Sequence, residues 1–207
     1  MLPTYNEAGT IGEVVQRVLA STPHVDILVV DDNSPDGTGS LADDIAAREQ
    51  RVRVLHRPGK AGLGPAYVAG FKDALARGFW AIIEMDSDLS HDPGDVPRLV
   101  KAAASADVVL GSRYTPGGGT RNWSKGRERL SRGGNAYARA LLGLPVRDIT
   151  AGFRCYRREV LEELPLATGE TPYARYGAAI EVAIGTGAFL FALAPFVFGR
   201  KRKVGES

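Results

Sequence analysis

The stretch Ile27-Leu28-Val29-Val30-Asp31-Asp32-Asn33-Ser34-Pro35-Asp36-Gly37-Thr38 decides the fold, because four apolar residues run directly into a polar segment rich in turn formers. The apolar run at its start predicts a short buried strand. Before it, apolar residues recur at helical spacing over residues 10–20, behind a Thr10 cap. At its end, Thr38 or Ser40 can cap a second helix. A strand between two helices indicates an α/β unit.

The same alternation continues along the chain. Apolar runs at 52–55, 80–83 and 108–110 predict further strands, and helical patterns end near Leu75 and cover 95–104. Strands that alternate with helices predict parallel βαβ units and a doubly wound, mostly parallel α/β sheet. In such sheets, ligands bind beyond the carboxyl ends of the strands.

Polar groups follow three of the predicted strands at that edge. Val30 leads into Asp31 and Asp32, Ile83 leads into Glu84-Met85-Asp86-Ser87-Asp88, and Leu110 leads into Gly111-Ser112-Arg113-Tyr114. Two carboxylates one residue apart can hold a hard divalent cation, and Mg²⁺ commonly joins one or two carboxylates to substrate phosphates. The pattern predicts a metal–diphosphate site, with an ordinary acidic turn as the alternative.

Composition excludes disordered, collagen-like and disulfide-scaffold proteins. The chain has 207 residues, of which 44% are apolar and 24% charged, so one globular domain is expected. Cys155 is the single cysteine, so the fold does not depend on an oxidising compartment. The opening Met1-Leu2-Pro3-Thr4 has no features of a secretory signal, and a cytoplasmic location is expected.

Charge is unevenly distributed although the net charge is only +2. Residues 1–50 carry nine acids against two bases, whereas residues 113–158 carry eleven Arg and Lys against Glu128 and Asp148. An acidic half that holds a metal and a basic half that holds anions is one interpretation, and two solvated faces is the other. No nucleic-acid-binding motif is present, so no nucleic-acid partner is expected.

Other catalytic motifs are missing. No P-loop pattern occurs, and the glycine-rich segment 59–64 does not match the dinucleotide fingerprint, so a tight turn before a helix is its alternative interpretation. His24, His56 and His91 lack metal spacing, and no Ser-His-Asp or Cys-His set is evident. Nucleophilic catalysis by the protein is therefore not expected.

Taken together, the motifs make the sequence resemble glycosyltransferase family 2, and within it the dolichyl- or polyprenyl-phosphate mannosyltransferases. The resemblance covers roughly residues 2–165 in the family's order. The matching pieces are Pro3-Thr4-Tyr5-Asn6-Glu7, the stretch 30–38, Gly62-Leu63-Gly64, Met85-Asp86-Ser87-Asp88-Leu89-Ser90-His91, Gly111-Ser112-Arg113-Tyr114, Ser131-Arg132-Gly133 and Asp148-Ile149-Thr150-Ala151-Gly152-Phe153-Arg154.

The resemblance implies a GT-A, Rossmann-like nucleotide-sugar-binding fold and the transfer of mannose from GDP-mannose to a polyprenyl phosphate. By position it implies a guanosine site formed by Pro3, Tyr5, Glu7, Val30 and Asp32. It implies that Mg²⁺ or Mn²⁺ is held by Asp86, Asp88 and Ser90, and that the donor is also contacted by Ser87, Arg113 and Arg202. The residues implied near the acceptor phosphate are Arg127 and Ser131. Asp88 and Arg113 are the implied catalytic residues.

Elementary chemistry agrees with these implied roles. Arg127 and Ser131 are four residues apart, so on a helix they share one face and can grip one phosphate. An acceptor phosphate is already anionic at neutral pH and attacks without a strong general base. The reaction then needs positioning and neutralisation of the leaving diphosphate. Asp148 either orients the acceptor side or supports its own loop.

The chain departs from the family at both ends. Only Met1 and Leu2 precede the first motif, so the first strand is nearly missing. Residues 1–165 are expected to form the GT-A core, and residues 166–207 a divergent helix, strand and basic loop that complete the same domain. Ala179 stands where the family has Gln. Within the basic loop 200–203, Arg202 best matches the donor-phosphate arginine, with Lys201 as the alternative.

A lipid acceptor implies a membrane partner. Residues 177–198 form a segment long and apolar enough that a membrane-spanning helix is one interpretation. Peripheral attachment at the cytosolic membrane face is favoured instead, through the basic loop and an anchoring partner or separate membrane domain. Two rival functions stay open. One is a polyprenyl-phosphate glycosyltransferase that uses a UDP-sugar, and the other is a catalytically impaired homologue that binds nucleotide sugar.

Overall fold

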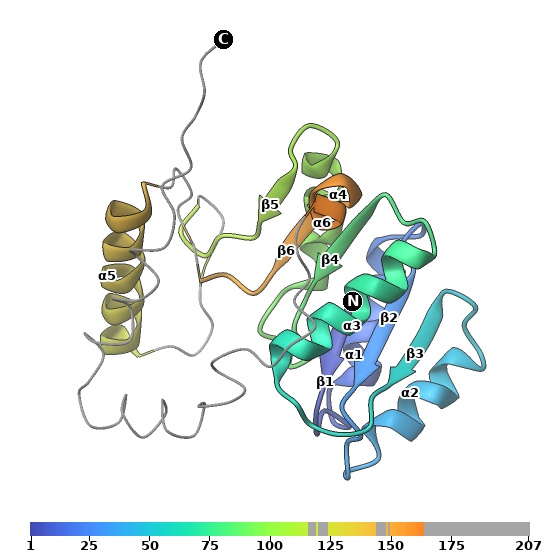
Figure 1. Cartoon of the computed structure of the whole chain (residues 1–207). Coiled ribbons are helices and arrows are strands. Elements are labelled where there is room, and N and C mark those ends of the chain that lie inside the picture. The colour runs from blue at the N-terminus through green and yellow to red at the C-terminus, as the bar shows by residue number, and fades with distance from the viewer. Residues whose placement is uncertain (116–118, 120–123, 144–147, 149, 164–207) are drawn as a thin grey trace. The chain divides into compact units, whose positions relative to one another are not determined.

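The computed structural model describes residues 1–115, 119, 124–143, 148 and 150–163. Alternating strands and helices occupy this part of the chain (Figure 1). The elements are β1 (Leu2–Thr4), α1 (Ile11–Ser21), β2 (Ile27–Asp31), α2 (Thr38–Ala46), β3 (Val52–His56), α3 (Leu63–Ala76), β4 (Ala81–Glu84), the 3₁₀ helix η1 (Pro93–Asp95), α4 (Val96–Ala103), β5 (Val108–Leu110), α5 (Lys125–Leu142), β6 (Arg154–Arg157) and α6 (Arg158–Glu163).

The first sheet is parallel, with strand order β1-β2-β3. Val29 lies in its middle strand, opposite Leu2 on one side and Val54 on the other, and is completely buried. β2 reads as a continuous apolar run because helices cover both of its faces. The predicted strand at 27–30 and its parallel βαβ connections are confirmed.

The second sheet has the order β4-β6-β5, and β6 is antiparallel to both neighbours. The strands expected at 80–83 and 108–110 are present as β4 and β5. They do not pair with each other, because β6 lies between them. The antiparallel β6 was not among the strands predicted from the sequence. Arg154-Cys155-Tyr156-Arg157 carries no apolar run that would mark it as a strand, although Cys155 at its centre is completely buried.

Backbone hydrogen bonds join the two sheets at the start of the chain. The Met1 nitrogen donates to the Ile83 carbonyl at 2.8 Å, and the Met1 carbonyl accepts from the Met85 N–H at 3.2 Å. The first strand, expected to be nearly missing, is three residues long and still bridges β2 and β4. Gly70 of α3 packs so closely on Met1 that a Cβ there would overlap the methionine sulfur.

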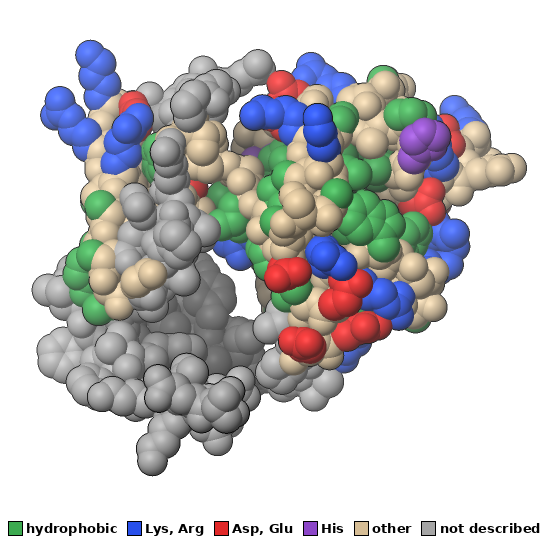
Figure 2. All heavy atoms as spheres, turned by 90° about the horizontal axis from the view of Figure 1, so that it is seen from above, with side chains coloured by type: hydrophobic (Ala, Val, Ile, Leu, Met, Phe, Trp, Pro, Cys, Tyr) green, Lys and Arg blue, Asp and Glu red, His purple; other side chains and the backbone are tan. Residues whose placement is uncertain are grey.

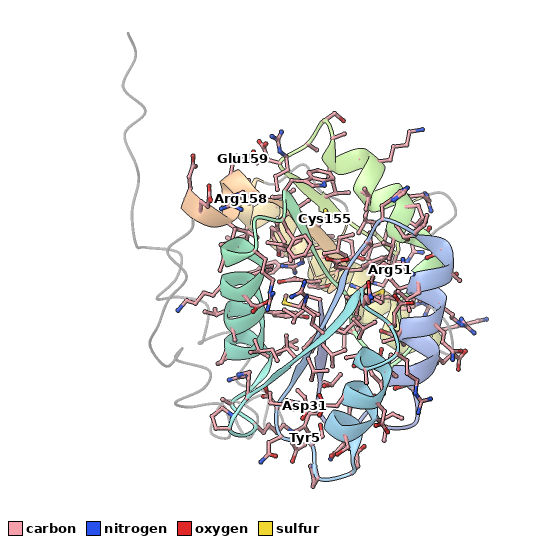
Figure 3. The ribbon with its side chains drawn as sticks, turned by 90° about the vertical axis from the view of Figure 1, so that its right-hand side faces the viewer. Tyr5, Asp31, Arg51, Cys155, Arg158 and Glu159 are labelled. Atoms are coloured by element: carbon pink, nitrogen blue, oxygen red, sulfur yellow. The ribbon has the colours of Figure 1, made fainter. Side chains whose placement is uncertain are left out.

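Helices lie on both faces of the strands. α3 and α6 contact each other on one face, while α1 contacts both α2 and α4 on the other, as the side view in Figure 3 shows. On the face drawn in Figure 2, acidic and basic side chains are intermixed, as expected of solvated charges. The largest buried cluster includes Ile11, Val15 and Val29 and fills the space between α1 and the strands.

Two predicted helix caps differ in detail. Thr10 precedes α1, but its hydroxyl donates to the Glu7 carbonyl and carboxylate instead of accepting from the helix. Thr38 is the first residue of α2, and Gly37 takes the cap position with φ of 89°. The Thr38 hydroxyl is instead used to bind a neighbouring loop, and glycine accepts the left-handed backbone without strain.

The predictions for residues 166–207, including the apolar segment 177–198, lie outside the described residues. Among the helices that the structure describes, none is both long and apolar enough to cross a bilayer.

Candidate active site

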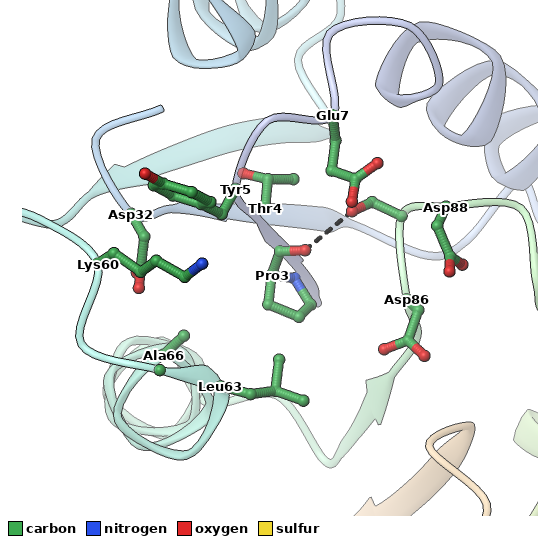
Figure 4. A pocket seen from close by; sticks show the side chains of 12 residues that line it. Pro3, Thr4, Tyr5, Glu7, Asp32, Lys60, Leu63, Ala66, Asp86 and Asp88 are labelled. Atoms are coloured by element: carbon green, nitrogen blue, oxygen red, sulfur yellow. Dashed lines mark hydrogen bonds between the residues drawn. The ribbon is translucent and has the colours of Figure 1, made fainter. Parts of the chain in front are cut away.

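A cavity of about 250 Å³ opens where β1, β2 and β4 end, at the edge expected to bind ligands (Figure 4). Acidic, aromatic and backbone groups from four segments meet in it. It is lined by Pro3, Thr4, Tyr5, Glu7, Asp32, Lys60, Gly62, Leu63, Ala66, Asp86, Ser87 and Asp88. The structure therefore brings together seven of the residues named from the sequence: Pro3, Tyr5, Glu7, Asp32, Asp86, Ser87 and Asp88.

The loop after β1 is held by the loop after β2. The backbone N–H of Glu7 donates to the Thr38 hydroxyl at 2.9 Å, and the N–H of Ala8 donates to the Asp36 carboxylate at 3.1 Å. The Thr38 hydroxyl in turn donates to Asp36 at 2.5 Å. These bonds explain why a polar run follows the second strand: its side chains fix the backbone that carries Tyr5 and Glu7 into the cavity.

Asp32 is buried and has partners for both carboxylate oxygens. The Arg57 guanidinium contacts one oxygen at 2.5 Å, and the backbone N–H of Ala61 donates to the other at 3.2 Å. Both partners belong to the segment after β3. Asp32 thus anchors the glycine-rich loop to the cavity rim in addition to lining the cavity itself.

Asp86 and Asp88 follow β4 on a sharp turn. Leu89 adopts φ of 63°, a left-handed conformation that is uncommon for an apolar side chain. The Asp88 carboxylate accepts from the Ser90 N–H at 2.9 Å, and the buried Ser87 hydroxyl donates to the Pro3 carbonyl at 2.9 Å. Turn strain of this kind persists only where surrounding contacts hold it, and here those contacts aim both carboxylates into the cavity.

The two carboxylates differ in their protonation energetics. Burial raises the pKa of Asp86, and the charge of Asp88 adds to the rise, while the nearby His91 opposes it. Burial also raises the pKa of Asp88, but the hydrogen bonds from Ser90 outweigh it, so this pKa lies below its ordinary value. A cation between them would favour the charged form of both.

His91 supports this turn from behind. Its Nδ1 accepts the backbone N–H of Asp86 at 3.1 Å, and its ring stacks on Phe153 with centroids 5.2 Å apart. Gly152 lies against both the Asp86 carboxylate and the His91 ring, because a Cβ at this position would be 3.2 Å from the first and 3.4 Å from the second. Burial lowers the pKa of His91, against the effect of the neighbouring aspartates, which is consistent with a neutral ring that accepts at Nδ1.

Arg113 does not line the cavity of about 250 Å³. It lies in an adjoining groove of about 590 Å³ that also contains Ser90, His91 and Phe153. Its guanidinium binds the carboxylate of Asp148 at 2.7 and 2.8 Å, and its backbone N–H donates to the same group at 3.1 Å. Asp148 is completely buried. Burial raises its pKa, but the bonds from Arg113 outweigh it and hold the pKa below the ordinary value.

The remaining predicted residues lie elsewhere. Val30 is fully buried in β2 and is not a lining residue. Ser131 lies on α5, where its hydroxyl accepts from the Tyr114 hydroxyl at 2.7 Å. Arg127 belongs to the same helix, but its side chain is outside the described part of the chain, as is all of Arg202.

The residues present fit a divalent cation that is shared with a substrate. Asp86 and Asp88 supply two oxygen donors to one cavity, with the Ser90 hydroxyl adjacent in sequence. Within the described residues, no cluster of three or more His, Cys, Asp or Glu could hold a metal. A cation bound by two carboxylates must complete its shell with water or phosphate oxygens, which is how Mg²⁺ commonly binds in nucleotide sites.

A family model for glycosyl transferase family 2 matches residues 1–165, the part of the chain that carries the motifs described above apart from the basic loop at 200–203. The chain belongs to glycosyl transferase family 2. The predicted family and the α/β GT-A fold are thereby confirmed.

Characterised relatives lie close to this family member in sequence. Over 169 residues it is 54% identical to the polyprenol monophosphomannose synthase of Mycolicibacterium smegmatis, covering 81% of this chain and 64% of the relative. Over 186 residues it is 45% identical to the undecaprenyl-phosphate mannosyltransferase of Micrococcus luteus, covering 90% and 76% respectively. The chain thus spans less than two thirds of the length of the first of these relatives.

Two solved structures share the fold. A mannosyltransferase from Pyrobaculum calidifontis in complex with GDP-Man and Mn²⁺ matches with a TM-score of 0.54 at 21% identity, over 82% of this chain and 47% of that one. A glucosyl-3-phosphoglycerate synthase from Mycobacterium tuberculosis in complex with Mn²⁺ and UDP-glucose matches with a TM-score of 0.57 at 25% identity, over 90% and 64%.

Sequence reasoning missed several residues of this family 2 site. Thr4, Lys60 and Ala66 line the cavity but were not assigned to the site from the sequence, and the segment 59–64 had a tight turn as its alternative interpretation. The available signal was its position: the segment follows the carboxyl end of β3, at the same sheet edge as the acidic turns.

Proposed function

We propose that this chain transfers mannose from GDP-mannose to a polyprenyl phosphate and so forms polyprenyl-phosphate mannose. The observation that carries the proposal is the single cavity in which Tyr5 and Asp32 lie at one end and the Asp86–Asp88 pair at the other. A nucleoside at the first end would place its diphosphate near the two carboxylates. The names of the relatives at 54% and 45% identity support mannose as the sugar and a polyprenyl phosphate as the acceptor.

In this proposal Pro3, Tyr5, Glu7 and Asp32 bind the guanosine end. The buried Val30 supports them from within β2, and Ser87 holds the floor of the cavity through its bond to Pro3. Asp86 and Asp88, with Ser90, would hold Mg²⁺ or Mn²⁺, which supplies charge neutralisation for the diphosphate when bound. Mn²⁺ is present in both of the solved structures described above.

The transfer itself is an inverting displacement. An acceptor phosphate oxygen forms a bond to the anomeric carbon of mannose while the bond from that carbon to the GDP oxygen breaks. GDP leaves with the bonding electron pair. The attacking oxygen is already anionic, so no protein group needs to remove a proton, which fits a cavity without a paired nucleophile and base among the described residues. Asp88 and Arg113 are the residues we assign to catalysis.

The acceptor side is proposed to lie between α5 and the groove that contains Arg113. Ser131 and Arg127 share a face of α5, and the hydroxyl bond from Tyr114 joins Ser131 to the segment after β5. Arg202 is proposed to reach the donor phosphate. Action at the cytosolic membrane face follows from a lipid acceptor and is peripheral in this proposal, with an anchoring partner or a separate membrane domain as further expected components.

A transfer assay tests the proposal directly. Purified protein, labelled GDP-mannose and a short polyprenyl phosphate are combined with Mg²⁺ or Mn²⁺, and again with EDTA, and the lipid product is extracted. We expect mannolipid in the presence of metal and a loss of product with EDTA. Intact GDP binding without product would instead support the impaired-homologue alternative.

Competition distinguishes the donor. GDP is expected to displace labelled GDP-mannose much more effectively than UDP does. Stronger displacement by UDP would support the rival UDP-sugar function, which the UDP-glucose complex of the Mycobacterium tuberculosis enzyme makes chemically reasonable for this fold.

A further inference from the structure

The nucleotide cavity is rich in carboxylates and has a single lysine at its rim. Four acidic side chains line it: Glu7, Asp32, Asp86 and Asp88. Among the described residues, Lys60 is the one Lys or Arg that lines the same cavity. Figure 4 shows its side chain extending from the glycine-rich loop over the cavity, on the side opposite Asp86 and Asp88.

Other cations near the site are already bound to carboxylates. Arg57 contacts Asp32 at 2.5 Å, and Arg113 binds the buried Asp148 with two nitrogens in the adjoining groove. Lys60 is different, because the contact that the structure gives its ammonium group is the face of the Tyr5 ring, 4.2 Å from the ring centroid. An exposed cation–π contact of this kind is weak compared with a charge-assisted bond to phosphate.

The loop that carries Lys60 is held in place. Asp32 binds the side chain of Arg57, which precedes the glycine-rich loop, and accepts from the N–H of Ala61 within it, so the backbone is anchored before and directly after Lys60. Gly62 follows with φ of 92°, a backbone conformation that glycine adopts readily and other residues rarely do. The loop therefore presents the lysine from a defined position, while its side chain keeps the freedom to leave the Tyr5 ring.

We infer that Lys60 is a further donor-binding residue, which moves from the face of Tyr5 to the diphosphate of the bound nucleoside diphosphate sugar. The inference rests on the proposed function and deepens it. Its physical basis is charge. Arg57 neutralises Asp32, which leaves three of the four cavity carboxylates without a basic partner lining the cavity among the described residues. A single divalent cation does not neutralise these three carboxylates and the incoming diphosphate together. Leaving the ring also exposes the Tyr5 face for stacking with the nucleobase.

Binding measurements on the purified chain with excess Mn²⁺ test this inference. GDP binding is measured by calorimetry for the wild type, Lys60→Ala and Lys60→Arg, with Lys72→Ala as the matched control on the exposed surface of α3. We expect Lys60→Ala to weaken GDP binding about tenfold, the lower range for a charge-assisted contact, while Lys60→Arg stays near the wild type and Lys72→Ala is unchanged. Lys60 is exposed, so these variants should fold normally.

Two further readouts separate the diphosphate from the base. Guanosine, measured by competition with a fluorescent GDP analogue, should bind Lys60→Ala at least as tightly as the wild type, because it makes no diphosphate contact and the Tyr5 face is already open in this variant. Added salt should weaken GDP binding less in Lys60→Ala than in the wild type. An equal loss for guanosine and GDP, or unchanged GDP binding in Lys60→Ala, would overturn the inference while leaving the proposed function intact. Wild-type protein that binds no nucleoside diphosphate would overturn the proposed function as well.

Discussion

The two sheets of this chain build their share of the site in different ways. Around β1–β3, each strand pairs with a neighbour close in sequence, and the loops at the strand ends are tied to each other by Asp32, Asp36 and Thr38. Around β4–β6–β5, the middle strand comes from beyond α5, so β4 and β5 both pair with a strand from much later in the chain. The parallel part is thus assembled from strands that follow one another in the chain, whereas the antiparallel part is completed only when a later segment inserts between β4 and β5.

The largest expected effect comes from the charged turn after β4. Asp88→Ala should lower the transfer rate about 1000-fold, since loss of one of two metal carboxylates removes several kcal/mol of charge stabilisation. The measurement is mannolipid formation at saturating GDP-mannose with Mg²⁺ or Mn²⁺. Asp44→Ala, an exposed aspartate on α2, is the control and should retain full activity. Unchanged activity in Asp88→Ala would remove this carboxylate from the metal site.

An intermediate effect on stability is expected at the ion pair behind β5. Asp148→Asn should lower the free energy of unfolding by about 2 kcal/mol at pH 7, because it removes a charge-assisted bond to Arg113. The pKa of Asp148 is lower in the folded chain than in the unfolded one, so its contribution is complete above about pH 4 and is lost as the pH falls through the folded value. Urea unfolding at pH 7 and pH 3 should therefore show a smaller penalty at pH 3.

The control for that pH dependence is Asp44→Asn, which should leave the unfolding curve nearly unchanged at both pH values. A penalty for Asp148→Asn that is equal at pH 7 and pH 3 would show that packing, and not the ion pair, accounts for the loss.

The smallest expected change in the free energy of unfolding comes from two conservative core variants, which should differ in their effect on GDP binding. Phe153→Leu and Ile27→Val should each lower the free energy of unfolding by about 1 kcal/mol, as expected for conservative changes at buried sites. Phe153→Leu also removes the ring that stacks on His91 behind Asp86, so it should weaken Mn²⁺-dependent GDP binding severalfold. Ile27→Val, in the parallel sheet, should leave that binding unchanged. Equal GDP affinity in the two variants would mean that the His91 support is not needed to position the carboxylates.

Much of the frame could be predicted from local pattern. The apolar run at 27–30 became β2, the helical spacing over 10–20 became α1, and the acidic turns lie at strand ends as expected. These features depend on residues close together in the chain, and periodicity reports on them directly. The strand β6 could not be recognised, because Arg154-Cys155-Tyr156-Arg157 shows neither an apolar run nor a clean alternation.

Within the site, the types of residue were easier to predict from the sequence than the hydrogen-bond and ring-contact partners of each side chain. The Asp86–Asp88 spacing indicated metal chemistry, but nothing in the sequence indicated that His91 would accept the Asp86 N–H. Lys60 belonged to a segment whose alternative interpretation was a plain turn, and only its position over Tyr5 marks it as part of the cavity.

By itself, the sequence determined the family, the α/β class and the edge of the sheet at which the cavity opens, because strand-ending motifs and their order are local properties of the chain. Tertiary structure alone decided that β6 separates β4 from β5, that Arg113 pairs with Asp148 outside the cavity, and that Lys60 lines the same cavity as four carboxylates. The physical reason is that charge pairing and strand insertion depend on distances between segments far apart in the chain. Those distances are set when the whole core packs.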